Sequence, residues 1–118
     1  MLRIDERRVD DVFLLDLRGK ITAGDGDVLI RDTIQQLVAR GARKIVLNFV
    51  EVPYMDSVGL STIIRSYLTL ERDGGRLRLL NVPKHLAELL TVTRLTTVFD
   101  TFNDETAVIR SFDAMGSS

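Results

Sequence analysis

The sequence predicts a single α/β domain with a mixed, mostly parallel β-sheet. Short apolar runs alternate with helical patterns along the chain, in the order β-β-α-β-α-β-α-β-α. The first two runs are close enough to pair as an antiparallel hairpin, whereas helices separate the later runs and favour parallel connections. The length of 118 residues suits one hydrophobic core. We therefore expect about five strands, with about four helices packed on the sheet.

The amino-terminal part predicts a hairpin followed by a helix. Residues 2–6 alternate loosely and indicate an edge strand, and Val12–Leu17 is a denser apolar run that is typical of a buried strand. Residues 9–11 would form the turn between them. After the glycine-rich loop 19–27, helical spacing places four apolar residues on one face: Ile30, Ile34, Leu37 and Val38. Gly41 stands where such a helix ends.

The rest of the chain alternates between strand and helix. Residues 44–49 predict a strand, and the helix after it is the best defined, because five apolar residues share one face: Leu60, Ile63, Ile64, Tyr67 and Leu68. Residues 77–80 predict the next strand, and Pro83 suits the first turn of a third helix. Residues 98–100 predict a brief last strand. Residues 103–105 then open an amphipathic helix through Val108, Ile109 and Phe112.

Acidic residues stand at the predicted starts of two helices. Asp25 or Asp27 is expected to cap the first helix, and Asp104 with Glu105 opens the last one. Negative charge is favourable there because the helix dipole is positive at the amino terminus. This structural role accounts for both acidic pairs without a catalytic site.

Composition argues against several classes of function. The net charge is −1 and no basic stripe accumulates, so we expect no nucleic-acid binding. The chain has no cysteine and a single histidine, so we assign no metal site. We assign no cofactor, because the glycines match no phosphate-binding loop. We expect a cytoplasmic protein without direct membrane insertion, because no apolar run approaches the ~20 residues of a membrane helix and no secretory signal is present.

The chain is not expected to be an enzyme, and no catalytic residue is assigned. A triad of Ser57, His85 and Asp56 fails because adjacent residues cannot both flank one imidazole in the required order. A hydrolase that uses Ser57 would also lack a base and an oxyanion arrangement. We interpret His85 as a side chain on a helix surface.

One segment, Tyr-Met-Asp-Ser-Val-Gly-Leu at residues 54–60, places a polar pair directly before the best-defined helix. One interpretation is structural: Asp56 or Ser57 caps the helix, and Gly59 allows close packing. The other is functional: Ser57 displays a hydroxyl where the positive end of the helix dipole accommodates a phosphate. The pattern alone favours the structural interpretation.

The same segment resembles the STAS domain family, and specifically the bacterial anti-sigma factor antagonists. The resemblance is carried by IVLN at 45–48 and YMDSVGL at 54–60, with support from LRGKI at 17–21, GGRL at 74–77, LLNVP at 79–83 and TVF at 97–99. It covers about residues 5–112 and agrees with the predicted order of elements. It implies one STAS-like domain at residues 1–113. Residues 114–118 would be a flexible tail or a remnant of the expression vector.

The resemblance implies a partner-switching protein in signal transduction, without catalysis of its own. In such proteins, an anti-sigma factor that is also a serine kinase phosphorylates the serine matching Ser57, and a phosphoserine phosphatase reverses the modification. The unphosphorylated form binds the anti-sigma factor and frees a sigma factor for transcription. The phosphorylated form releases the anti-sigma factor.

The partner surface is expected to surround Ser57. It would include the loop after the second strand and the first turns of the helix: Lys20, Thr22, Asp25, Asp56, Val58, Ser61 and Arg65. Asn48 and Gly59 are expected to support the loop. Three positions depart from the family pattern: Val58 replaces a small residue, Ser61 replaces a common glycine, and Lys20 replaces a frequent acidic residue.

The main alternative is a STAS subunit that never uses Ser57, either in a large signalling assembly or with a lipid-transport ABC complex. The intact Asp56–Ser57 pair favours the switching protein, whereas Val58 favours the alternative. The sequence leaves open which kinase, phosphatase and sigma factor are involved, and it leaves the oligomeric state open.

Overall fold

The predicted α/β fold is confirmed. The computed structural model describes residues 1–115, with side chains through Asp113. Its elements are β1 (Arg3–Val9), β2 (Val12–Arg18), α1 (Gly26–Ala39), β3 (Lys44–Glu51), α2 (Ser57–Arg72), β4 (Arg76–Leu80), α3 (Lys84–Val92), β5 (Thr101–Phe102), α4 (Glu105–Ser111) and the 3-10 helix η1 (Phe112–Met115). Of the predicted tail, residues 114–115 continue η1, and residues 116–118 lie outside the described part of the chain.

The sheet is mixed and mostly parallel, as predicted. The strand order is β1-β2-β3-β4-β5. β1 pairs with β2 as an antiparallel hairpin, and the other three pairings are parallel. Asp10 in the hairpin turn has a φ of 55°, a left-handed conformation that aspartate tolerates better than most residues.

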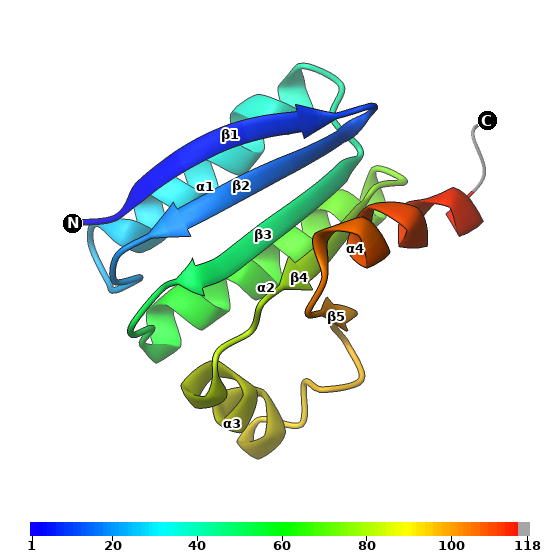
Figure 1. Ribbon diagram of the computed structural model, residues 1–118. Helices are drawn as coiled ribbons and strands as arrows, with labels where there is room; N and C mark the ends of the chain where they lie inside the picture. The colour runs from blue at the N-terminus through cyan, green and yellow to red at the C-terminus, as the bar shows by residue number, and fades with distance from the viewer. Residues whose placement is uncertain (116–118) are drawn as a thin grey trace.

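Helices cover both faces of the sheet, but unequally. α1 and α2 pack on one face, and α4 packs on the other near β4 and β5 (Figure 1). Leu15 and Leu17 of β2 point into the main core under α1 and α2, whereas Val12 and Leu14 point into a smaller cluster under α4. Burial on both faces explains why β2 is a continuous apolar run rather than an alternating one.

The last strand was predicted two to three residues too early. Residues 98–100 precede the strand, although the carbonyl of Asp100 already accepts the amide of Leu79 at 3.0 Å; β5 is Thr101–Phe102, which pairs with Leu79 and Leu80. Phe99 is 3% exposed, and its ring meets that of Tyr67 edge-on at 5.2 Å between centroids. The apolar residues before β5 therefore anchor a loop in the core.

Helix boundaries agree with the predictions, but one cap does not. Asp104 accepts the amide of Ala107 at 2.9 Å and caps α4. Asp25 occupies the N-cap position of α1, but its side chain makes no capping hydrogen bond. Asp27 accepts the amide of Gly24 at 2.8 Å instead. The predicted side-chain cap of α1 was therefore wrong, because the carboxylate of Asp27 closes the preceding loop and that of Asp25 bonds to no helix amide.

Candidate functional site

Ser57 is the first residue of α2, and its side chain is exposed. The sequence left open whether Asp56 or Ser57 caps this helix. The cap is Asp56, whose Oδ1 accepts the amide of Gly59 at 2.9 Å. In the described part of the chain, the Ser57 hydroxyl takes part in no hydrogen bond. It is therefore displayed at the positive end of the helix and is not used in building the helix.

Asp56 also ties the loop after β2 to this helix. Its Oδ2 accepts the amide of Ala23 at 3.0 Å. Its own amide donates to the carbonyl of Ile21 at 3.1 Å, and Ile21 donates to the carbonyl of Tyr54 at 3.0 Å. The hydrogen bonds from the amides of Gly59 and Ala23 lower the pKa of Asp56, so the carboxylate is ionised at neutral pH. One negative charge thus holds two backbone segments beside Ser57.

Gly59 allows the first turn of α2 to approach the same loop closely. A Cβ atom at this position would lie 2.7 Å from the carbonyl oxygen of Ile21 and 2.9 Å from Cγ of Met55. The first of these atoms belongs to the backbone and cannot rotate away. The predicted supporting role of Gly59 therefore has a geometric basis, which is the absence of a side chain where the helix contacts the loop.

Gly59→Ala is expected to lower the free energy of unfolding by about 1–3 kcal/mol, because the added methyl group overlaps the Ile21 carbonyl. Urea denaturation would measure the change. Ser61→Ala, two residues later on the same helix, is the control and should remain close to wild type. Helix propensity alone predicts that Gly59→Ala gains about 1 kcal/mol, so a stabilised variant would contradict the proposed packing.

The structure brings the predicted partner surface together at one end of the sheet, where β2 and β3 end (Figure 1). Lys20, Asp25 and Arg65 are exposed, Thr22 and Ser61 are half-buried, and Val58 is 40% exposed. Residues 57, 61 and 65 are spaced by four and share one face of α2. The loop and the first two turns of α2 therefore form one continuous surface around Ser57.

Asn48 does not hold the Ser57 loop, and this prediction was wrong. The residue is 8% exposed; its amide donates to Asp16 at 2.9 Å, and its Oδ1 accepts from Asn81 at 3.1 Å and from the amide of Val50 at 3.2 Å. Side chains alternate along β3, so Asn48 points to the face that carries α4, while Phe49 points toward α2. Asn48 therefore supports the opposite face of the sheet.

Comparison with known proteins agrees with this geometry. The family model of the STAS domain matches residues 3–108. The chain belongs to the STAS domain family. The anti-sigma-B factor antagonist of Bacillus subtilis (strain 168) is 28% identical over 100 residues, which cover 84% of this chain and 89% of that protein.

Solved structures show the same fold. An anti-sigma factor antagonist from Mycobacterium paratuberculosis has a TM-score of 0.82 at 17% identity, covering 94% of this STAS domain and 93% of that chain. The Bacillus cell fate determinant SpoIIAA in its phosphorylated form has a TM-score of 0.73 at 23% identity, covering 92% of this chain and 99% of its own. The resemblance predicted from the motif around Ser57 is confirmed.

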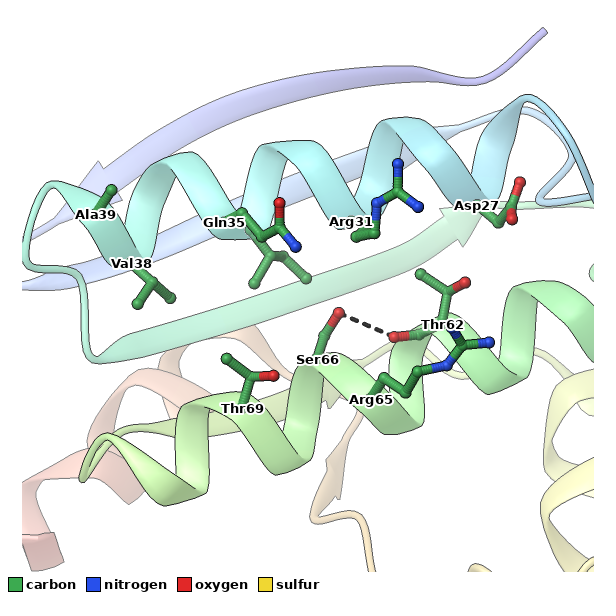
Figure 2. A pocket seen from close by; sticks show the side chains of 10 residues that line it. Asp27, Arg31, Gln35, Val38, Ala39, Thr62, Arg65, Ser66 and Thr69 are labelled. Atoms are coloured by element: carbon green, nitrogen blue, oxygen red, sulfur yellow. Dashed lines mark hydrogen bonds between the residues drawn. The ribbon is translucent and has the colours of Figure 1, made fainter.

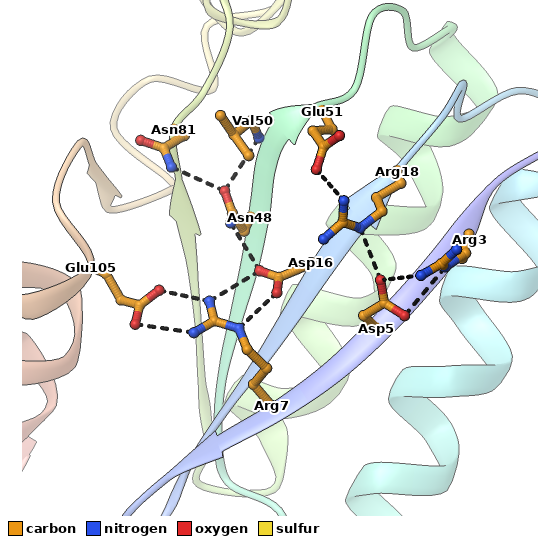
Figure 3. A network of polar contacts seen from close by, with 10 residues as sticks. All are labelled: Arg3, Asp5, Arg7, Asp16, Arg18, Asn48, Val50, Glu51, Asn81 and Glu105. Atoms are coloured by element: carbon orange, nitrogen blue, oxygen red, sulfur yellow. Dashed lines mark hydrogen bonds and ion pairs between the residues drawn. The ribbon is translucent and has the colours of Figure 1, made fainter.

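The face of the sheet that carries α4 also has an ion-pair network that the sequence did not reveal (Figure 3). Arg7 donates two hydrogen bonds to Asp16, at 2.7 and 3.1 Å, and two to Glu105, at 2.6 and 3.2 Å. Burial raises the pKa of Asp16, but the hydrogen bonds from Arg7 and Asn48 outweigh it, and the pKa is lowered overall. The network joins β1, β2, β3 and α4 and therefore has a structural role.

Residues 1–115 offer neither a metal-binding cluster nor a membrane-spanning helix. No group of three or more His, Cys, Asp or Glu side chains in this range could hold a metal ion. No helix in the same range is long and apolar enough to cross a membrane.

His85 lies on α3 but is half-buried, and its Nε2 is buried without a hydrogen-bond partner within the described chain, so the predicted surface position was only partly right.

Proposed function

We propose that this protein is an anti-sigma factor antagonist that binds an anti-sigma factor through the surface around Ser57. The observation that supports this proposal most directly is the exposed Ser57 hydroxyl at the first turn of α2, beside a loop that Asp56 fixes. Proteins similar in sequence and in fold are named anti-sigma factor antagonists. The protein acts by binding in the cytoplasm, without catalysis of its own, and controls transcription by freeing a sigma factor.

Phosphorylation of Ser57 is proposed to end this binding. An anti-sigma factor that is also a serine kinase transfers the γ-phosphoryl group of ATP to Oγ of Ser57. The Oγ–P bond forms, the bond to the β-phosphate oxygen breaks, ADP leaves and the hydroxyl proton is released. A phosphoserine phosphatase hydrolyses the ester and restores the serine. No group of this chain performs either reaction; the chain supplies only an accessible hydroxyl.

The electrostatic setting explains why the phosphate disrupts binding. It adds about −1.5 to −2 charges at neutral pH, directly beside the ionised Asp56 carboxylate. Asp56 already accepts the amides of Gly59 and Ala23, so the new charge finds these two donors occupied. A partner surface shaped for a neutral serine must then desolvate an unpaired dianion, which is unfavourable.

Transfer of radioactive phosphate from ATP tests the proposal, with the kinase recovered from the protein's own cells on the unmodified protein as bait. Wild type and Ser61→Ala are expected to be labelled, whereas Ser57→Ala is not. Equal labelling of Ser57→Ala would reject the site, and loss of label in Ser61→Ala alone would move it by one turn. Identical partner sets for the unmodified protein and Ser57→Asp would favour the non-switching STAS subunit.

A further inference from the structure

A groove runs between α1 and α2, on the outer side of the helix layer (Figure 2). Its volume is about 490 Å³. The α1 wall contributes Arg31 and Val38, and the α2 wall contributes Thr62, Arg65 and Thr69. Apart from Arg65, the side chains on the α2 wall are small (Thr62, Ser66 and Thr69), and the Ser66 hydroxyl donates to the carbonyl of Thr62 at 2.9 Å. We call this feature the α1–α2 groove.

The α1–α2 groove has an excess of positive charge. Arg31 lies on one wall and Arg65 on the other, and both are exposed. Among the described residues, the one ion pair of Arg31 is with its neighbour Asp32, at 3.3 Å, and Arg65 forms none. The one carboxylate lining the groove among the described residues is Asp27, which already accepts the amide of Gly24. An anionic group between the two arginines would therefore be attracted by them more strongly than it would be repelled by Asp27.

The groove continues across α2 as a second depression of about 450 Å³. The two share Arg65 and Thr69, and the second also contains Leu68 and Arg72. Leu68 is 56% exposed, although its spacing placed it on the apolar face of the helix, and two arginines flank it. The two depressions together extend from α1 over α2, with arginines at three positions and apolar side chains such as Val38 and Leu68 among them. That pattern suits a length of polypeptide better than a compact small molecule.

We propose that the α1–α2 groove, with its extension over Leu68, binds an acidic segment of a protein partner. The carboxylates of that segment lie between Arg31 and Arg65 and beside Arg72, and an apolar side chain covers Leu68. Charge complementarity carries the assignment, since three arginines surround the surface and only one of its lining residues is acidic. This binding does not require phosphorylation of Ser57, although Arg65 belongs to both surfaces.

A random 12-residue peptide library displayed on phage is the probe, selected on the immobilised wild-type protein. Selected peptides are expected to be enriched in Asp and Glu with at least one apolar residue. Synthetic copies should bind about tenfold or more weakly to the Arg31→Glu/Arg65→Glu variant. Lys84→Glu/Arg110→Glu carries the same change in net charge on α3 and α4 and should bind like wild type. Selection on the groove variant should favour basic peptides instead.

Three outcomes would overturn the proposal. Peptides without acidic enrichment, or peptides that bind the groove variant as tightly as wild type, would remove the charge argument, provided that circular dichroism shows both variants folded. Displacement of the peptides by citrate at equal concentration would instead assign the groove to small polyanions. Binding should persist in Ser57→Asp, so failure here and failure of the switch at Ser57 are separately visible.

Discussion

Replacement of Phe112 by alanine is expected to lower the free energy of unfolding by about 3–5 kcal/mol. Phe112 begins η1 and is 1% exposed. It packs in the smaller cluster beneath α4, with Val12, Leu14, Val46, Leu80 and Val108. Within the described residues, this face is covered only by α4 and the short η1, so few neighbours can move into the space left by the ring. Urea denaturation should show a lower midpoint with an unchanged slope.

Arg78 makes this position more informative than an ordinary core residue. Its guanidinium lies 4.5 Å from the centre of the Phe112 ring, and its Nε and Nη1 are buried without hydrogen-bond partners in the described chain. Burial lowers the pKa of Arg78, and Asp100, at 4.0 Å, offsets this only in part. The ring thus provides, beside Asp100, a second favourable contact for a poorly solvated cation. A double-mutant cycle of Phe112→Leu with Arg78→Met should give a coupling of about 1–2 kcal/mol.

Ile109→Ala, on the adjoining helix α4, provides the comparison, because Ile109 is half-buried and packs against the same cluster. Its cost should be clearly smaller than that of Phe112→Ala. If the free energies of unfolding of both variants lie within about 1 kcal/mol of wild type, the carboxyl-terminal helix does not anchor this face. The role assigned to Phe112 would then be wrong.

The fold was predictable because its signals are local. The apolar face of α2 and the dense run of β2 identify their elements within a few residues, and the alternation of the two types limits the topology. The last strand was misplaced because Val98 and Phe99 look like a strand when only their hydrophobicity is read. The burial of Phe99 comes from contacts with distant residues such as Tyr67, which no local pattern reports.

The site divides in the same way. Ser57 and Asp56 were found because the cap, the helix and the hydroxyl lie within one short segment. Asn48 was misassigned, although the strand itself held the correction: Leu47 and Phe49 point to the main core, so the residue between them must point away. The Arg7 network and the α1–α2 groove were invisible, because they join residues up to 98 positions apart.

Phosphorylation of Ser57 is expected to weaken binding of the anti-sigma factor by more than about a hundredfold, which corresponds to ~3 kcal/mol. The cost arises because the phosphate lies beside the ionised Asp56, at a surface that the partner must cover. Ser57→Asp adds a single charge and should lose less affinity than the phosphorylated protein. Ser57→Gln adds bulk without charge, so it measures the steric contribution to the loss of affinity by itself. Titration calorimetry on the four forms measures the series.

The domain itself should not refold when the phosphate is added, because the hydrogen bonds that fix the loop end on Asp56 and not on Ser57. In a ¹⁵N–¹H spectrum, the amides of Ala23 and Gly59 should therefore keep the shifted positions of donors to a carboxylate, while those of Ser57 and Val58 move. Release of both donors would mean that the phosphate displaces Asp56 and frees the loop. Binding would then be lost through a change of shape, and raising the salt concentration would not restore it. If both donors stay on Asp56, the affinity is lost because the partner must desolvate the phosphate in place; salt screens charges at a buried contact only weakly, so the two amide positions, and not the salt dependence, distinguish the two explanations.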